Sequence, residues 1–405
     1  MKKLLFLLPL LLLLSSCGKP VPDSAKTLYG STDRFAAAGE VLWHCDLEAR
    51  NLRWLDPVSG RTGSAHSDPL CGHEWEDDCP FAFLFLYSLA ADGNILWFSG
   101  QKMGMDQDSA AVFRWDMEAQ KLTKIADLCE GASVFLDKWC VSGGFLWYAY
   151  TVTEEITASG QAVRYEIRKI PLSGGEPETA ADMGEDSMFR FWVEGGSLYT
   201  SHFGERDICR DGAFFADPGG GTLAVADGWL WCCRNIHIME REPDDPDTSP
   251  TGFIECELWR VPLDDPGSEG ELVLTPAVSA APFFGEDGQV YIEPYAGRLL
   301  FRGKGLWPGS GRDQTTYVYG GTDRILAFDP GSGETKEFLR FGADFLCYGL
   351  YGLGEGWAVV SGFTLPDPER IDGDLRVNDP DFIMDYGYYR VDPATGERER
   401  LDFGF

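Results

Sequence analysis

A two-part pattern recurs seven times along this 405-residue chain and constrains its fold more than any other feature. The first part is a short glycine turn followed by a Leu-aromatic pair or a close variant, whose leading residues are Leu42, Leu96, Leu146, Leu198, Leu230, Leu300 and Ala358. The second part is a turn rich in Asp, Pro and Gly between two β-prone runs, at residues 56–60, 116–120, 171–176, 217–221, 264–269, 329–334 and 392–397. Asp accepts bonds from turn N–H groups, Pro presets φ and Gly tolerates positive φ, so each turn predicts a hairpin.

The leading residues lie mostly 50 to 58 positions apart, with one gap of 32 followed by one of 70. A period near 50 with four strand signals in each unit is typical of a β-propeller. The sequence therefore predicts an all-β fold, a single β-propeller of seven four-stranded blades over residues 28–405, with six and eight blades as the alternatives. The short and long gaps predict a trimmed fourth blade and an insertion in the fifth.

The pattern also predicts how the blades meet. A blade's small sheet cannot cover both of its own faces, so we expect the aromatic of each pair to fill the space between blades, as at Trp43, Trp97, Trp147 and Trp231. Each blade is complete within itself, so the ring should close by packing blade seven on blade one. Residues 27–29 could add an outer strand.

The phase of the repeat separates the two faces of the disc. In an antiparallel blade, the turns between the first and second strands and between the third and fourth strands share one face, and here they are short. The long segments should all lie on the other face: residues 64–80, 101–110, 151–161, 234–252, 303–320 and 363–386. Variable loops on a rigid scaffold are where binding is usually placed.

The N-terminus predicts export. Lys2 and Lys3 precede an apolar run over residues 4–14, which is too short to span a bilayer. The run ends in Leu-Ser-Ser-Cys-Gly, which resembles the lipobox of bacterial lipoproteins, so residues 1–16 form a signal peptide and Cys17 becomes the lipidated first residue. Two acyl chains give stable anchoring. We expect residues 17–27 to tether the domain to the bilayer at the extracellular face of the cell membrane; an ordinary signal peptide with a chance cysteine is the alternative.

Charge narrows the range of partners. The net charge is −31, which argues against a nucleic-acid partner and favours cationic ligands, metal ions or neutral sugars, or simply a solvated acidic surface. Ten cysteines follow Cys17, an even number that permits disulfides in an exported protein, although cysteines inside strand patterns can equally be buried thiols.

The densest group of reactive side chains is Cys71, His73 and Cys79, between the first two blades. A Cys71–Cys79 disulfide would stabilise the fold by roughly 2.5 kcal/mol in the chain-entropy treatment. The alternatives are a zinc site that includes His73, or unpaired thiols. With its flanking prolines, this Pro-x-Cys-x-His…Cys-Pro element, together with the lipobox and the Gly-x-Leu-Trp/Tyr repeats, resembles β-propeller surface lipoproteins of anaerobic Gram-positive bacteria. The resemblance implies a fold and an anchor and carries no activity.

The loops carry the remaining candidates. Acidic residues at 240–247 and 367–381 could hold calcium, but neither segment has the EF-hand order and a solvated acidic loop is the alternative. No cofactor is expected. No Gly-x-Ser-x-Gly or His-Glu-x-x-His pattern occurs. The sequence thus favours binding of a sugar, cationic peptide or protein partner without catalysis. A carbohydrate-active enzyme that uses loop carboxylates and an envelope assembly or sensing subunit are the alternatives. The candidate ligand-binding residues are His73, Trp75, Trp307, Asp372 and Asp374.

Overall fold

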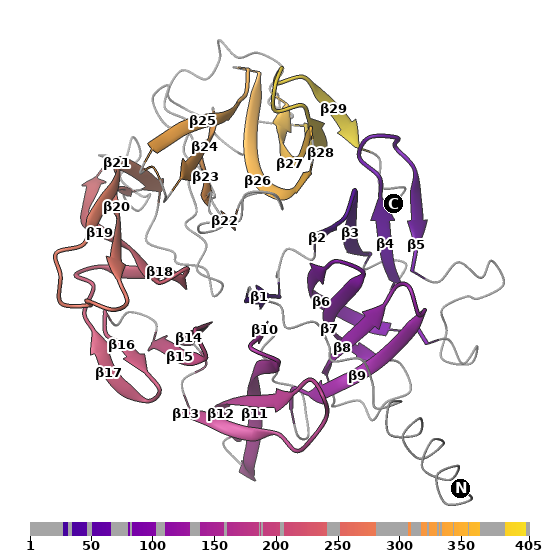
Figure 1. Ribbon diagram of the computed structural model, residues 1–405, viewed down its shortest axis with the longest axis vertical. Coiled ribbons are helices and arrows are strands. Elements are labelled where there is room, and N and C mark those ends of the chain that lie inside the picture. Colours follow the sequence, from indigo (N-terminus) through magenta and orange to yellow (C-terminus); the bar gives the residue numbers. More distant parts are fainter. Residues whose placement is uncertain are drawn as a thin grey trace, which may run out of the picture.

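A computed structural model shows seven antiparallel sheets arranged in a ring (Figure 1). The structure describes residues 27–30, 35–46, 51–65, 80–81, 83–102, 110–129, 138–157, 160–185, 187, 189–202, 206–240, 252–280, 307–308, 317–321, 324–329, 332, 334–342, 344–354, 356–364 and 385–401. Within these residues every sheet has four consecutive strands, and one sheet gains a fifth. The prediction of a seven-bladed propeller is confirmed, since Leu198 and Leu230 lie in different sheets.

Strand order runs outward from the centre of the ring in each blade, here called strands A to D. Blade one contains β2 (Phe35–Ala38), β3 (Val41–Asp46), β4 (Asn51–Leu55) and β5 (Thr62–Ser64). Blade two contains β6 (Phe83–Asp92), β7 (Ile95–Lys102), β8 (Ala111–Asp116) and β9 (Lys121–Asp127). Blade three contains β10 (Trp139–Ser142), β11 (Phe145–Thr157), β12 (Gly160–Pro171) and β13 (Glu178–Gly184).

The remaining blades follow the same order. Blade four contains β14 (Phe189–Glu194), β15 (Ser197–His202), β16 (Ile208–Arg210) and β17 (Ala213–Ala216). Blade five contains β18 (Gly221–Ala226), β19 (Trp229–Glu240), β20 (Gly252–Pro262) and β21 (Glu271–Ala280). Blade six contains β22 (Trp307–Pro308), β23 (Tyr317–Gly321), β24 (Arg324–Asp329) and β25 (Glu334–Arg340). Blade seven contains β26 (Phe345–Gly354), β27 (Trp357–Thr364), β28 (Asp385–Val391) and β29 (Arg398–Leu401).

Both residues of the Leu-aromatic pair are buried, because side chains alternate across a strand and both faces of strand B are covered. Leu96 packs in the cluster between blades one and two, whereas Trp97 packs in the cluster between blades two and three. Leu146 and Trp147 repeat this arrangement one blade further on. The expectation that the aromatic fills the space between blades is therefore confirmed for Trp43, Trp97 and Trp147, and Trp231 is also buried.

Short turns join strands A to B and C to D in most blades. At Gly39 φ is +61°, a conformation that favours glycine. In the turn at 56–60, the Asp56 carboxylate accepts bonds from the Val58 and Ser59 N–H groups at 2.9 and 3.1 Å, and φ of Gly60 is +70°. These features are the ones that the sequence predicts for the turn.

Blade four corrects one predicted turn. Residues 217–220 connect β17 to β18 and therefore link two blades, rather than joining strands C and D of blade four. Strands β16 and β17 are instead joined by Asp211 and Gly212, with φ of +50° and +80°. Two residues with positive φ suit a two-residue hairpin turn, and the Asp211 carboxylate accepts a bond from the Leu198 N–H at 2.9 Å.

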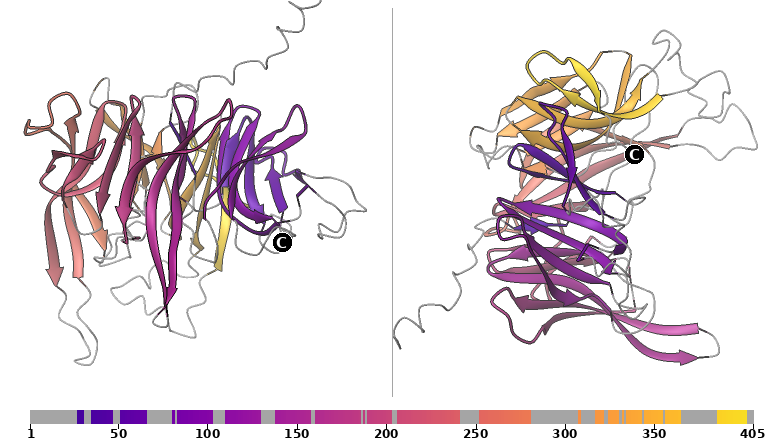
Figure 2. Two further views of the ribbon diagram at one scale, coloured as in Figure 1. Left: turned by 90° about the horizontal axis from the view of Figure 1, so that it is seen from below. Right: turned by 90° about the vertical axis from the view of Figure 1, so that its right-hand side faces the viewer.

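Three predicted loops also contain strands. In blade six, β22 and most of β23 occupy the expected loop at 303–320, and strand B is β23 rather than the segment at Leu300. Most of the expected loop at 151–161 extends the B and C strands of blade three, and residues 234–240 and 252 of the expected loop at 234–252 belong to the B and C strands of blade five. Figure 2 shows the resulting long hairpins, β11–β12 and β19–β20, projecting from one side of the disc. Once two strands pair, their ladder can continue beyond the buried part of the blade, which repeat spacing alone does not reveal.

The first strand also differs from the prediction. β1 (Leu28–Tyr29) is the innermost strand of blade three, paired with β10, and lies at the centre of the ring rather than at its outside (Figure 1). An exposed inner edge of strand A offers unpaired backbone groups, and β1 satisfies those of β10.

Ring closure uses packing between complete blades, as predicted. Phe35, Leu42 and Leu55 of blade one form one cluster with Trp357 and Val359 of blade seven. In addition, Arg390 of blade seven donates to the backbone carbonyls of Pro57 and Val58 of blade one at 2.9 and 3.1 Å. No strand is shared across this seam among the described residues, so side chains hold the two ends of the ring together.

Candidate ligand-binding face

The predicted site residues are largely outside the described part of the chain. Cys17, Cys71, His73, Trp75, Cys79, Asp372 and Asp374 lie there, so their grouping stays a prediction. Trp307 is the first residue of β22, the innermost strand of blade six, and only its backbone is described. The described strand ends nevertheless define the face on which these segments attach.

The two faces of the disc differ in their connections. The turn face carries the A–B and C–D connections, such as residues 39–40, 93–94, 143–144 and 392–397. The loop face carries the B–C and D–A connections, where strand A begins and strand B ends. Segments 66–79 and 365–384, which contain most of the predicted site residues, connect strands at the loop face.

Aromatic side chains mark the loop-face ends of the inner strands. Six of the seven described A strands begin with one: Phe35, Phe83, Trp139, Phe189, Trp307 and Phe345. The five whose side chains are described are buried, and each packs in a cluster with the preceding blade. This ring of aromatics seals the seams beneath the loops. The seven-fold repeat pattern does not reveal this ring of aromatics, although an aromatic at the start of six of the seven described A strands is a sequence signal for it.

Trp139 shows how such a residue is fixed. Its indole N–H donates to the Ser88 hydroxyl at 2.6 Å, and Ser88 lies 2.6 Å from the Ser99 hydroxyl oxygen. Both serines are fully buried, and they belong to blade two whereas Trp139 belongs to blade three. A buried polar group is costly unless it is paired, so this chain of bonds fixes the position of one blade against the next.

The junction between blades seven and one contains polar as well as aromatic side chains. We call the group Phe35, His44, Tyr351, Ser361, Tyr386 and Tyr388 the seam cluster. The Phe35 ring lies 5.8 Å from His44, 4.7 Å from Tyr351 and 5.3 Å from Tyr388, measured between ring centroids. The Tyr351 and Ser361 hydroxyl oxygens are 3.0 Å apart.

Tyr386 forms the exposed end of this cluster. Its ring is 5.9 Å from that of Tyr388, and 38% of its surface is exposed. It stands at the start of β28, directly after the acidic segment that contains Asp372 and Asp374. A tyrosine held at its inner side and open at its outer side can contact a ligand at the loop face.

His44 is neutral at physiological pH. Burial lowers its pKa from 6.5 to about 4; the charge of Asp46 acts against this and that of Arg53 adds to it. Asp46 and Arg53 form an ion pair, with 3.1 Å between Oδ2 and Nε, in which only Arg53 reaches solvent. The seam thus contains a neutral imidazole beside a partly buried ion pair.

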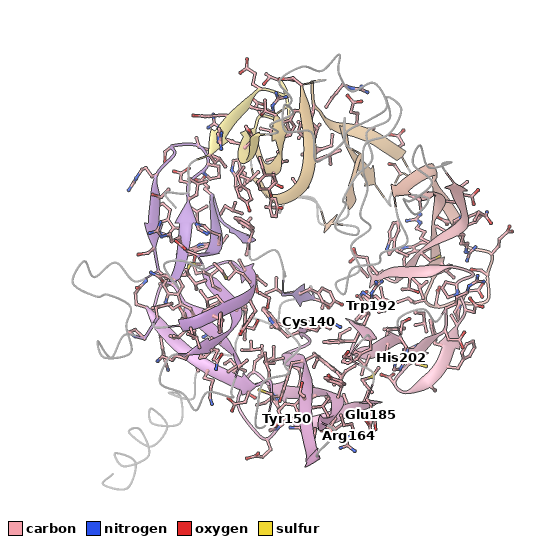
Figure 3. All side chains as sticks on the ribbon, turned by 180° about the vertical axis from the view of Figure 1, so that it is seen from behind. Cys140, Tyr150, Arg164, Glu185, Trp192 and His202 are labelled. Carbon is pink, nitrogen blue, oxygen red and sulfur yellow. The ribbon has the colours of Figure 1, made fainter. Side chains whose placement is uncertain are left out.

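Blade three carries a second charged group on its long hairpin. Glu166 is almost fully buried and accepts bonds from Arg164 at 2.7 Å, Arg168 at 2.8 Å and Thr179 at 3.0 Å. Burial by itself raises the pKa of Glu166, but the bonds from Arg168 and Thr179 and the two arginine charges outweigh it, leaving the pKa below its ordinary value. Arg168 also lies over the Tyr150 ring at 3.5 Å. This network holds the hairpin rigidly against the blade; Figure 3 shows Tyr150 and Arg164 at this blade.

The described cysteines include free thiols. Cys140, Cys209 and Cys232 form no disulfide. Burial raises the pKa of Cys140 and of Cys232, which keeps both as neutral thiols. Within the described part of the chain, no three His, Cys, Asp or Glu side chains gather closely enough to hold a metal ion, and no helix is long and apolar enough to cross a membrane.

Comparisons with known proteins support the architecture alone. No family model matches the chain, and no curated protein is similar to it in sequence. Its fold is similar to acylaminoacyl peptidase from Pyrococcus horikoshii, with 10% identity and a TM-score of 0.40 over 93% of this chain and 52% of the peptidase. It is also similar to the β-propeller domain of the Trilobed protease from Pyrococcus furiosus, with 10% identity and a TM-score of 0.32 over 90% and 78% of the two chains. A third similar structure is oligogalacturonate lyase from Vibrio parahaemolyticus, with 10% identity and a TM-score of 0.29 over 95% and 80%. The chain thus spans about half the length of the peptidase, and what it shares with these proteins is a propeller scaffold.

Proposed function

We propose that the chain is a lipid-anchored propeller on the extracellular face of the cell membrane, which binds a ligand or protein partner on its loop face without catalysis of its own. The observation that carries the proposal is the unequal distribution of connections. The described A–B and C–D connections are short, whereas the two long hairpins, β11–β12 and β19–β20, leave the opposite face (Figure 2). The longer described connections are therefore collected on one side of the disc, and long loops on a scaffold are where binding is usually placed.

The chemistry of that side suits sugars or cationic peptides. Tyr386 offers a partly exposed ring, and the adjoining segment at 365–384 contributes a run of carboxylates. Trp75 and Trp307 belong to segments that start from the same face. Aromatic rings beside carboxylates can stack on sugar rings or attract cationic groups.

Glycan and cationic-peptide arrays probed with the intact protein test this proposal. We expect the variants Trp75→Ala, Trp307→Ala and Tyr386→Ala to bind the identified ligand about fivefold more weakly, because an aromatic contact contributes on the order of 1 kcal/mol. Phe214→Ala is the matched control, because Phe214 is an aromatic that is 66% exposed on the outer strand β17, beside the turn at Asp211–Gly212. Weakened binding in the control alone would place the site elsewhere.

Two further readouts separate the alternatives. Cleavage of an array glycan by the parent protein would replace the binding function with a carbohydrate-active enzyme. Binding measured with and without a chelator tests whether zinc or calcium contributes. The anchor is tested separately, since Cys17→Ala should leave the membrane fraction and lose acyl labelling; a variant that stays bound to membranes contradicts anchoring.

A further inference from the structure

The direction of β1 determines on which face the N-terminal tether leaves the disc. β1 is antiparallel to β10, with Leu28 opposite Val141 and Tyr29 opposite Cys140. Because β10 runs from the loop face to the A–B turn at 143–144, β1 runs the other way. The chain is therefore on the turn-face side at Thr27 and on the loop-face side at Gly30.

Side-chain contacts fix this segment between two blades. The Thr27 hydroxyl donates to the Val193 carbonyl at 2.9 Å and lies 2.8 Å from the Ser142 hydroxyl oxygen. The Tyr29 hydroxyl accepts a bond from the Val193 N–H at 3.0 Å. Both β10 of blade three and β14 of blade four thus hold β1 at the centre of the ring, close to Cys140 (Figure 3).

Gly30 completes the attachment. Its N–H donates to the Trp139 carbonyl at 3.1 Å, and a Cβ added at Gly30 would lie 2.5 Å from the Trp139 ring. A larger residue at position 30 would therefore displace β1 or the tryptophan.

The reach of the tether disfavours an exit at the loop face by way of the rim. Residues 17–26 span at most about 35 Å when fully extended. One path from Thr27 to the loop face passes around the rim of the disc. That path crosses a blade of four strands about 4.8 Å apart and then climbs a strand of six residues, which together require roughly 35 Å. The tether would be fully extended along this path, and no residues would remain to reach a membrane on that side.

From this geometry we infer that the turn face is directed toward the membrane and the loop face away from it. The inference rests on the proposed lipid anchor at Cys17, and it deepens the proposed function: the partner of the loop face is a molecule that arrives from the external medium, rather than a lipid or a protein embedded in the same membrane. The turn face itself carries exposed carboxylates, including Glu40, Glu118 and Glu397. Anionic headgroups repel these groups, so the tether holds the disc off the bilayer.

Energy transfer from single fluorophores to a headgroup-labelled lipid tests the orientation. A fluorescent amino acid replaces Glu176 in one lipidated protein and Glu185 in another; both glutamates are exposed, and they flank opposite ends of β13. Since they lie nine positions apart with the seven residues of β13 between them, their separation is at most about 30 Å, and we expect transfer from position 176 to exceed that from position 185 by about twofold or more. Equal transfer, or greater transfer from position 185, overturns the inference.

Two variants distinguish the possible failures. Gly30→Ala should release β1 and reduce the difference between positions 176 and 185, whereas Gly267→Ala, which meets no atom within 4 Å of the added Cβ and has no positive φ, should leave it unchanged. A difference that persists in Gly30→Ala would show that β1 does not determine the orientation. Cys17→Ala should abolish transfer from both positions. A parent protein without acyl groups overturns the anchor and the orientation together, whereas an acylated parent with reversed transfer overturns only the orientation.

Discussion

His44 should make the propeller progressively less stable as the pH falls below neutral. The imidazole is 2% exposed in the seam between blades seven and one, and its pKa is lowered from 6.5 to about 4. Between these values the unfolded chain binds a proton that the folded chain does not bind. Stability is therefore complete above pH 6.5 and is lost as the pH falls from about 6.5 to about 4.

The size of the effect follows from the shift in pKa. Each pKa unit corresponds to about 1.4 kcal/mol, so protonation of His44 should lower the free energy of unfolding by about 3 kcal/mol once the pH is below 4. At pH 5 the loss should be about 2 kcal/mol, since the folded group is still mostly neutral there. The charge of Asp46 raises the pKa of His44 and the charge of Arg53 lowers it. The measured loss of stability therefore includes the effect of this ion pair.

Urea unfolding at pH 7.5 and pH 5.0 measures this loss. Gln cannot take up a proton, so His44→Gln should lose about 2 kcal/mol less than the parent between the two pH values. Burial raises the pKa of Glu194, which stabilises the fold as the pH falls, but this contribution is common to both proteins and cancels. His202→Gln, at a partly buried histidine, is the control and should retain the loss. A loss in His44→Gln as large as that in the parent would refute the reasoning.

Three further measurements test the packing of the ring. Arg390→Ala removes a charged donor from two carbonyls of blade one and should lower the free energy of unfolding by about 1–3 kcal/mol; an unchanged urea midpoint would show that the bonds contribute nothing. Trp43→Ala should cost about 3–5 kcal/mol by thermal or urea unfolding. Trp43→Phe should cost clearly less, because among the described residues the Trp43 indole N–H has no hydrogen-bond partner, and equal costs would contradict this. Cys140 and Cys232 are buried thiols with raised pKa, so both should react with a disulfide reagent only after denaturation, and fast reaction in the native protein would contradict their burial.

The sequence predicts the architecture well because the fold is a sum of local repeats. Leu96 and Trp97 are neighbours in the chain, and the alternation of a strand sends them to opposite sides of the blade. The turn at Asp56 is likewise complete within five residues. Each such signal depends on a short stretch of chain, so repetition at a fixed period is enough to place most of the blades.

Other features depend on contacts that no short stretch contains. The partners of Tyr29 lie in blades three and four, more than a hundred residues away, so β1 reads equally well as an inner or an outer strand. The turn at 217–220 has the composition of the C–D turns but lies between blades, because Asp211 and Gly212 already close the hairpin of blade four. The seam cluster joins residues from opposite ends of the chain, and neither end contains a sequence pattern that predicts their contact.

The seam between blades seven and one joins structural closure to the candidate binding face. This seam contains a histidine, an ion pair and hydroxyl groups beside its apolar cluster. Polar groups add less stability than apolar ones at a buried interface unless every partner is in place. Because this seam has no shared strand among the described residues, its rigidity depends on those partners and on Arg390. A ligand that contacts Tyr386 would bind beside this junction, and it would add contacts to a seam that side chains hold together.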